Sequence, residues 1–187
     1  MENIDRRSFL KKSSVATAGA FVSSPIINHI PVKKNPNDTI NVAVIGIRSR
    51  GRHLYRSLAK IPEVKIALLC DIDQRLLPEA VAEVEKLTGF KPSTSTEYRK
   101  VLENKDIDVV TIATPNHWHA LQTIWACQAG KDVFVEKPVS HTVLEGRKMV
   151  DAARKYNRVV QTGTQARSSI SAMQAIEWLN DGGLGKI

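Results

Sequence analysis

The sequence is poor in the residues on which several classes of protein depend. Its two cysteines, Cys70 and Cys127, lack C-x-x-C spacing and are too few for a disulfide framework or a zinc knuckle. No apolar run approaches the roughly 20 residues of a membrane-spanning helix, and no His, Cys and Asp cluster has metal-ligand spacing, so we expect no metal. With 42% hydrophobic and 25% charged residues, the 187-residue chain can still build the core of about one domain.

The net charge of +8 does not by itself indicate a nucleic-acid partner. Residues 1–39 hold six Lys and Arg against three acidic residues, and the rest of the chain carries +5. Those charges are mostly interleaved along expected helices, as on an ordinary solvated surface. Because neither a recognition-helix motif nor an aromatic stacking motif accompanies them, we expect no nucleic acid as a partner.

Residues 1–30 have the features of an export signal. Arg6 and Arg7 precede a Phe-Leu-Lys sequence, and a weakly apolar stretch follows from Val15 to Val22. This order resembles a twin-arginine signal and predicts passage through the twin-arginine export machinery to the periplasm. A retained signal would instead anchor the protein on the periplasmic side of the inner membrane, and a basic tail without a targeting role is the alternative. Residues 31–38 have the composition of a linker.

Beyond the linker, apolar strands alternate with amphipathic helices. The expected strands cover residues 40–45, 64–70, 109–113, 133–135 and 159–162. Expected helices cover residues 50–61 and 78–88, with a helical turn at 98–102. Three more follow: one that carries Leu121, Ile124 and Trp125, one capped by Thr142 and Glu145, and a last one marked by Ile170, Met173, Ile176 and Leu179. This order predicts an α/β fold, a doubly wound parallel sheet of Rossmann type, with ligands at the carboxyl ends of the strands.

A glycine-containing turn follows the first expected strand. Gly46 and Gly51 occupy the first and third positions of the dinucleotide fingerprint, whereas Arg48 occupies the second. The Arg48 side chain hinders close approach of a pyrophosphate to the backbone, although its charge and that of Arg50 could neutralise phosphate. Since the helix N-terminus still offers free N–H groups, we count these positions and Ser49 as cofactor-binding candidates. A structural strand–turn–helix glycine pair is the alternative.

Asp71 ends the second expected strand, 20 residues after Gly51. That spacing is typical of the acid that binds the adenosine ribose of a dinucleotide. A carboxylate there accepts hydrogen bonds from both hydroxyls and repels a 2′-phosphate, which favours NAD over NADP. Arg75 nearby leaves NADP possible, and the alternative is that Asp71 or Asp73 only caps the following helix.

Two further segments are more specific. Residues 113–120 read Ala-Thr-Pro-Asn-His-Trp-His-Ala, and residues 130–138 read Gly-Lys-Asp-Val-Phe-Val-Glu-Lys-Pro. Together they closely resemble the Gfo/Idh/MocA family of nicotinamide-dependent oxidoreductases, and the resemblance extends from Ile40 to the C-terminus. It implies an NAD(P)-dependent oxidoreductase that transfers hydride at a secondary alcohol or carbonyl of a carbohydrate-like substrate: a sugar, a sugar acid or a cyclitol.

The same resemblance implies roles for individual residues. Lys137 would be catalytic and would contact the reacting hydroxyl or carbonyl, with Arg167 facing the substrate. The residues expected around the nicotinamide end of the cofactor follow three strands: Thr114, Pro115, Asn116, His119, Glu136 and Gln165.

The chemistry agrees with these roles. Oxidation of a secondary alcohol needs a group that takes the hydroxyl proton, which a lysine made neutral by burial or by nearby positive charge can do. Pro138 would give a rigid or cis turn that aims Lys137. Ordinary strand-end charges at Glu136 and Lys137 are the alternative, and we expect Trp118 and Trp125 to be core residues.

In this family a larger α/β domain follows the nucleotide-binding domain and forms most of the substrate pocket. We therefore expect residues 39–165 to form the NAD(P)-binding domain and residues 166–187 to begin a truncated substrate domain, with a homo-oligomer in the full-length form. A glycosidase that holds NAD for transient oxidation of its sugar is a close alternative. A non-catalytic nucleotide-binding partner protein is another, for which Arg48 and the missing domain are the best arguments.

Overall fold

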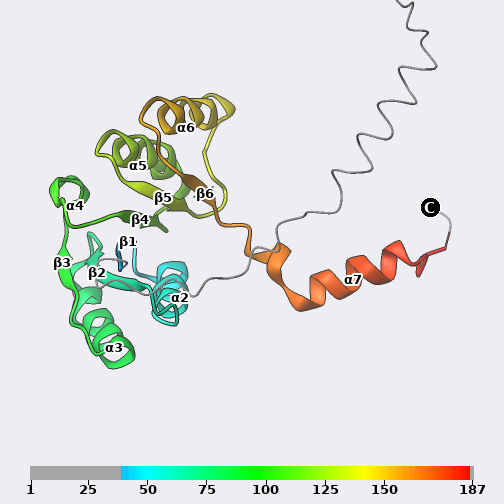
Figure 1. The fold of residues 1–187 in the computed structure, drawn as a ribbon, viewed down its shortest axis with the longest axis horizontal. Coiled ribbons are helices and arrows are strands. Elements are labelled where there is room, and N and C mark those ends of the chain that lie inside the picture. Colours follow the sequence, from blue (N-terminus) through cyan, green and yellow to red (C-terminus); the bar gives the residue numbers. More distant parts are fainter. Residues whose placement is uncertain (1–38, 186–187) are drawn as a thin grey trace, which may run out of the picture. The chain divides into compact units, whose positions relative to one another are not determined.

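The computed structural model describes residues 39–185, so the predicted export signal and linker lie outside the described residues. Along the chain the elements are β1 (Ile40–Ile45), α2 (Ser49–Leu58), β2 (Val64–Cys70), η1 (Gln74–Leu76), α3 (Leu77–Thr88), β3 (Ser93–Ser95), α4 (Tyr98–Glu103), β4 (Val109–Ile112), α5 (Asn116–Gln128), β5 (Asp132–Val135), α6 (Val143–Lys155), β6 (Val160–Thr162), η2 (Gln165–Ser168) and α7 (Ile170–Asn180) (Figure 1). The predicted strands and helices are thus present, with shifts of one to a few residues at their ends.

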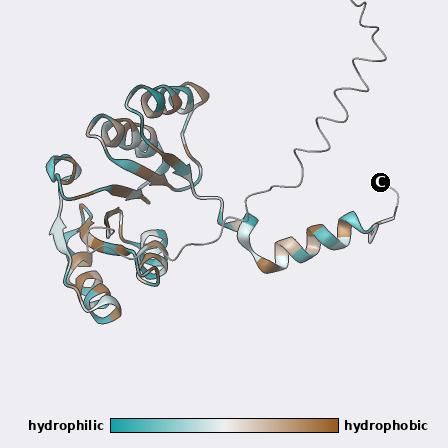
Figure 2. Cartoon of the chain, in the orientation of Figure 1, coloured by the Kyte–Doolittle hydropathy of each residue, from teal (hydrophilic) through white to brown (hydrophobic). Residues whose placement is uncertain are grey.

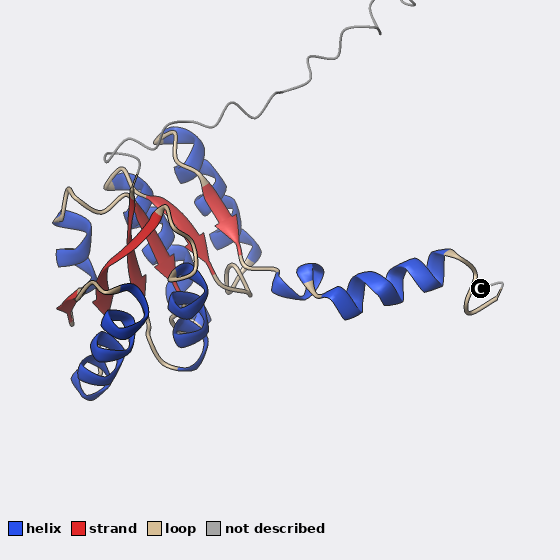
Figure 3. Cartoon of the chain, turned by 60° about the horizontal axis from the view of Figure 1, so that its bottom comes forward, coloured by secondary structure: helices blue, strands red, loops and turns tan. Residues whose placement is uncertain are grey.

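The strands form one six-stranded parallel sheet in the order β3-β2-β1-β4-β5-β6. From β1 the chain builds outward to β3 and then returns to place β4 on the other side of β1. The strand order therefore reverses between β1 and β4, which is the switch point where doubly wound sheets bind ligands. This topology confirms the predicted Rossmann-like fold, and Figure 3 shows helices on both faces of the sheet.

The two faces of the sheet are covered by different helices. In β1, Val42 and Val44 belong to the buried cluster beneath α2 and α3, whereas Ala43 and Ile45 belong to the cluster beneath α4, α5 and α6. This alternation follows from the two-residue period of a strand, and burial on both faces explains why β1 reads as a continuous apolar run. Figure 2 shows the central strands in brown and mixed colours along the helices.

Local signals placed several helix ends correctly. The capping box at the start of α6 is present: the Thr142 hydroxyl accepts from the Glu145 N–H at 3.2 Å, and the Glu145 carboxylate accepts from the Thr142 N–H at 2.9 Å. Helix α3 ends at Thr88, as predicted, and the following Gly89 caps it in the left-handed conformation.

Helix α5 buries mainly its small side chains. Leu121 is 40% exposed, whereas Ala120, Ala126 and Cys127 are buried. Small side chains let this helix approach β5 and α6 closely, so the larger leucine lies on the outer side. Strand β3 is not among the predicted strands, because its Ser-Thr-Ser segment is short and polar.

The predicted last helix is present as α7, and the apolar residues that mark it are exposed within the described residues. Ile170, Met173, Ile176 and Leu179 are all among the exposed large hydrophobic side chains, and α7 has no buried residue. In the range 39–185 no helix is both long and apolar enough to cross a membrane.

Candidate functional site

The residues that follow the strands are tied together by hydrogen bonds that continue the sheet. Four backbone N–H groups donate to neighbouring strands over 2.8–3.0 Å: Gly46 to Cys70, Ala113 to Ile45, Glu136 to Ile112, and Gly163 to Val135. The carboxyl edge therefore brings the glycine turn, the segment after β4 and the Glu-Lys-Pro segment to one side of the sheet, as the sequence predicts.

Gly46 and Gly51 allow the glycine turn to pack closely. Gly46 has a φ of +77°, and a Cβ there would lie 2.8 Å from the carbonyl oxygen of Ala113. A Cβ on Gly51 would overlap the carbonyl oxygen of Gly46. These two positions therefore need glycine for the reasons that the dinucleotide fingerprint gives, and the turn leaves the N-terminal N–H groups of α2 at the carboxyl edge, where a pyrophosphate fits.

Arg48 stands where the fingerprint has its second glycine, and its backbone explains why a side chain is tolerated. Its φ of −74° and ψ of 167° are extended values that any residue adopts, and the left-handed residue is Ser49, with a φ of 28°. The Arg48 guanidinium lies 3.9 Å from the Asp73 carboxylate. The side chain at this position thus pairs with the loop after β2.

Asp71 connects that loop to the glycine turn. One carboxylate oxygen accepts from the Ile47 N–H at 2.9 Å, and the other accepts from the Asp73 N–H at 3.0 Å. The capping role falls to Asp73, which accepts from the Arg75 N–H at the start of η1. Because each carboxylate oxygen can accept more than one hydrogen bond, Asp71 is fixed in place and still has acceptor sites for ribose hydroxyls.

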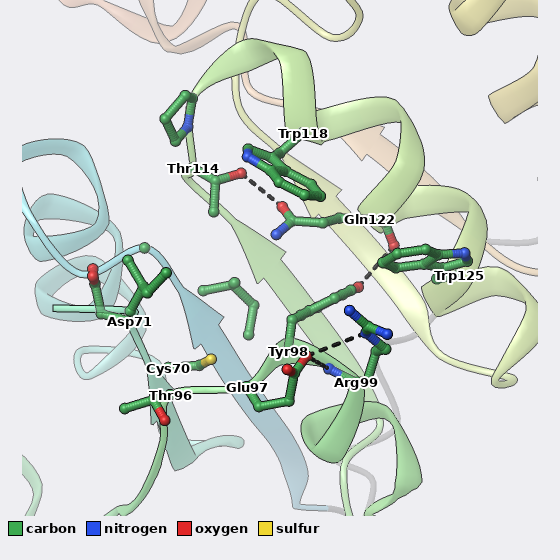
Figure 4. A pocket seen from close by; sticks show the side chains of 14 residues that line it. Cys70, Asp71, Thr96, Glu97, Tyr98, Arg99, Thr114, Trp118, Gln122 and Trp125 are labelled. Atoms are coloured by element: carbon green, nitrogen blue, oxygen red, sulfur yellow. Dashed lines mark hydrogen bonds and ion pairs between the residues drawn. The ribbon is translucent and has the colours of Figure 1, made fainter. Parts of the chain in front are cut away.

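A pocket of about 410 Å³ lies beside Asp71, between the strand ends and helices α4 and α5 (Figure 4). Trp118, Trp125 and Tyr98 line it, and the Tyr98 ring stacks on Trp125 with centroids 6.5 Å apart. The Gln122 side-chain oxygen accepts from the Thr114 hydroxyl at 2.6 Å. Aromatic walls next to a carboxylate suit a flat heterocycle such as adenine.

Trp125 packs against the buried core, as expected, whereas Trp118 is not a core residue. Trp118 is 44% exposed, and both rings border the pocket. The two tryptophans are seven residues apart on α5, so they lie on the same face of the helix. Because α5 begins at the end of β4, this spacing could have indicated a binding role for both rings.

Glu136 is a buried carboxylate at the end of β5. Its side chain is 4% exposed; one oxygen accepts from Arg50 Nε at 2.6 Å and the other from the Lys137 N–H at 3.2 Å. The backbone of Gly163 packs against it, since a Cβ on Gly163 would lie 2.9 Å from the Glu136 carboxylate. We expected the Arg50 charge to be available to neutralise phosphate. In the structure, the Glu136 carboxylate pairs with it and offsets that charge.

His119 joins two segments of the site from behind. Its buried ring lies with Nδ1 2.7 Å from the Pro138 carbonyl oxygen and Nε2 2.8 Å from the Thr114 carbonyl oxygen. Both ring nitrogens thereby lie within hydrogen-bond distance of backbone oxygens, so His119 holds the Pro138 turn against the segment after β4. The Lys137–Pro138 peptide bond is cis, as the sequence analysis allowed.

Lys137 projects from this turn with an exposed side chain in the described part of the chain. Asn116 is half-buried at the first turn of α5, directly after Pro115. The remaining predicted residues, Gln165 and Arg167, lie exposed in η2, shortly after Gly163.

Among residues 39–185, no three His, Cys, Asp or Glu side chains gather in a way that could hold a metal ion. The doubly wound sheet, the glycine turn, the acid after β2 and the aromatic pocket define a dinucleotide-binding Rossmann domain. The chain belongs to the Gfo/Idh/MocA family: the family model, described as an oxidoreductase family with an NAD-binding Rossmann fold, matches residues 40–164. This match confirms the family resemblance and NAD as the cofactor of the fold.

Relatives of two kinds resemble the chain. A glycosyl hydrolase family 109 protein of Shewanella baltica is 33% identical over 174 residues, which are 83% of this chain and 38% of that protein. An α-N-acetylgalactosaminidase of Shewanella oneidensis is 30% identical with the same coverage of both chains. The crystal structure of myo-inositol 2-dehydrogenase from Lactobacillus plantarum has a TM-score of 0.70 at 30% identity, covering 80% of this chain and 43% of that one. The chain thus spans less than half the length of these relatives.

Proposed function

We propose that this chain is the NAD-binding part of an oxidoreductase that acts on a secondary alcohol or carbonyl of a sugar, a sugar acid or a cyclitol. The observation that carries the proposal is the turn at Glu136, Lys137 and cis-Pro138, which lies at the same sheet edge as the glycine turn and is tied to it by Arg50. Oxidation of an alcohol needs a base near the nicotinamide to take the hydroxyl proton, and a lysine at this turn can serve as that base.

NAD would lie across the switch point between β1 and β4. Its adenine would occupy the pocket beside Trp118, and Asp71 would accept hydrogen bonds from the adenosine ribose. The pyrophosphate would meet the N–H groups of Ser49 and its neighbours at the start of α2. The nicotinamide ribose would then lie near Asn116 and Glu136, at the ends of β4 and β5.

Lys137 would move the proton in this reaction. When bound, NAD supplies an acceptor for the hydride that leaves the carbinol carbon. The Lys137 amine takes the hydroxyl proton, which leaves a ketone, and in the reverse direction its ammonium group returns that proton to the alcohol. Bound cofactor and substrate would exclude water from the now exposed amine.

A second candidate is an NAD-dependent glycosidase, and the observation that favours it is the 30–33% identity to the Shewanella proteins over 83% of the chain. In that function the same hydride and proton transfers would be transient, with the hydride returned to the sugar after the glycosidic bond has broken. Both candidates therefore share the roles of Asp71 and Lys137.

Binding tests the shared part of the proposal. Titration of the 187-residue chain with NAD should quench tryptophan fluorescence, because Trp118 and Trp125 line the pocket. Absence of any NAD binding by calorimetry would reject both candidates. The full-length protein, expressed from the complete open reading frame, is then assayed for activity. If it binds NAD but catalyses no reaction, a non-catalytic partner protein is favoured.

Products separate the two enzymatic candidates. A panel of polyols, inositols and sugars incubated with NAD should yield stoichiometric reduced cofactor if the protein is a dehydrogenase. A chromogenic N-acetyl-α-galactosaminide should instead release its leaving group, with no net reduced cofactor, if the protein is a glycosidase.

We also propose the organisation of the complete protein. Residues 1–30 would serve as a twin-arginine signal for export to the periplasm, and residues 166–187 would lead into a substrate domain that supports a homo-oligomer. The arrangement of Arg6 and Arg7 before a weakly apolar stretch supports the first point.

A further inference from the structure

Asp73 holds two arginines at the edge of the adenosine site. Its carboxylate pairs with Arg75 through Nε at 2.8 Å and Nη2 at 2.9 Å, and the Arg48 guanidinium lies 3.9 Å away. Arg75 follows β2, whereas Arg48 comes from the glycine turn. One carboxylate thus gathers two positive side chains from two different loops.

This cluster lies directly beside the acid that would bind the ribose. The Asp73 N–H donates to one oxygen of Asp71, and the Ile47 N–H, next to Arg48, donates to the other. Asp71 would accept a hydrogen bond from the 2′-hydroxyl of the adenosine ribose. In NADP the extra phosphate is attached at this same 2′ position. Both arginines therefore lie close to the place where a 2′-phosphate would arrive.

Arginine is the side chain that most often receives a 2′-phosphate, because its guanidinium forms two parallel charge-assisted hydrogen bonds with the oxygens. A guanidinium already engaged by a carboxylate must give up that partner before it can do so. The Arg75 guanidinium holds the pKa of the Asp73 carboxyl down at about 2. Asp73 is therefore ionised, and able to hold both arginines, at every pH used for enzyme assays.

We infer that Asp73 is a specificity-determining residue that excludes NADP by keeping Arg48 and Arg75 from a 2′-phosphate. The inference rests on the proposed NAD site at Asp71 and adds a second determinant to it: Asp71 repels the phosphate, and Asp73 withholds the cations that would attract it. The Arg48 side chain, which departs from the dinucleotide fingerprint, becomes part of this arrangement.

Asp73→Asn tests the inference in the 187-residue chain. Asparagine can still cap η1 through its side-chain oxygen, so the loop should keep its conformation. Calorimetric titration should show that NADP and 2′,5′-ADP bind to the Asp73→Asn variant about tenfold more tightly than they bind to the unmodified chain. NAD affinity should change by less than about twofold, because NAD has no 2′-phosphate. Asp151→Asn, an exposed aspartate on α6, makes the same change in net charge and should leave both affinities unaltered.

A triple variant identifies the groups responsible. Adding Arg48→Gln and Arg75→Gln to Asp73→Asn should return the ratio of NADP to NAD affinity to that of the unmodified chain. An unchanged ratio in Asp73→Asn, or a gain that persists in the triple variant, would overturn the inference while the proposed NAD site stands. If Asp73→Asn fails to fold by circular dichroism, Asp73→Ser, which also caps helices, replaces it with the same expectation. Failure of the unmodified chain to bind NAD would overturn the proposed function and the inference together.

Discussion

Arg50 Nε donates a hydrogen bond of 2.6 Å to the Glu136 carboxylate, across 86 residues of sequence. The arginine belongs to the first turn of α2, in the glycine turn, and the glutamate directly precedes Lys137. This ion pair joins the segment proposed to receive the pyrophosphate to the segment proposed to carry the chemistry. The ion pair would therefore fix the position of the Glu136–Lys137 segment relative to a cofactor bound at the glycine turn.

Arg50→Ala should lower the free energy of unfolding by about 1–3 kcal/mol. The Glu136 carboxylate would be left buried and unpaired, and the loss is smaller than for a fully buried pair because Arg50 is 36% exposed. Urea denaturation followed by circular dichroism measures it. Arg99→Ala, which breaks the exposed pair with Glu97, is the matched control and should cost less than about 1 kcal/mol. Equal losses in the two variants would show that Arg50 adds nothing beyond a surface pair.

Replacing Asp71 with Ser or Ala should weaken NAD binding and relax discrimination against NADP. The substitution removes a repulsive group that only accepts hydrogen bonds, and it also releases the N–H groups of Ile47 and Asp73. Parallel titrations with the two cofactors measure both effects. A clear preference of the unmodified protein for NADP would contradict the assignment.

Lys137→Ala in the complete enzyme should leave NAD affinity nearly unchanged and reduce turnover by about 10²–10⁴-fold, the range of general acid–base groups. Lys137→Arg should not restore turnover, because guanidinium does not lose a proton in this pH range. Steady-state kinetics and cofactor titration give the two quantities. Retained turnover in a folded Lys137→Ala protein would leave only a nucleotide-binding domain.

Stability should fall at alkaline pH, in part because of Cys70. Burial raises the pKa of the Cys70 thiol from about 9 to about 12, so the folded protein keeps this proton to higher pH than the unfolded chain does. The corresponding stability is complete below pH 9 and is lost as the pH rises toward 12. Urea midpoints measured through this range should decline less steeply in Cys70→Ala. Tyr55 and Tyr98, whose pKa values burial also raises, remain in both proteins. Parallel declines in the two proteins would argue against this effect.

A fusion of residues 1–38 to a reporter should reach the periplasm only in cells with a functional twin-arginine pathway. Changing both Arg6 and Arg7 to Lys should block export, since the receptor reads the guanidinium pair rather than its charge. Cell fractionation with reporter activity measures the outcome. Equal export of the double-lysine fusion would reject the signal.

Five of the six strands, the fold class and the family follow from the sequence alone, because the features that indicate them are local. Val42 to Ile45 is apolar at every position, which is what a strand buried on both faces requires. The capping box at Thr142 and Glu145 lies within four consecutive residues, so its geometry needs no information from elsewhere. The spacing between Gly51 and Asp71 likewise reflects one strand–helix–strand repeat.

The tertiary structure decided which side chains meet. The polar segment Ser93–Ser95 is a strand only because β2 offers it an edge to pair with. Leu121 turns outward because small neighbours on α5 allow close packing, which no helical period of its own sequence reveals. Arg50 and Arg48 both read as free cations in the glycine turn, yet the fold supplies each with a carboxylate from a distant loop, at Glu136 and at Asp73. The partner of a charged side chain is set by how the whole sheet brings its loops together, and one segment of sequence does not contain that information.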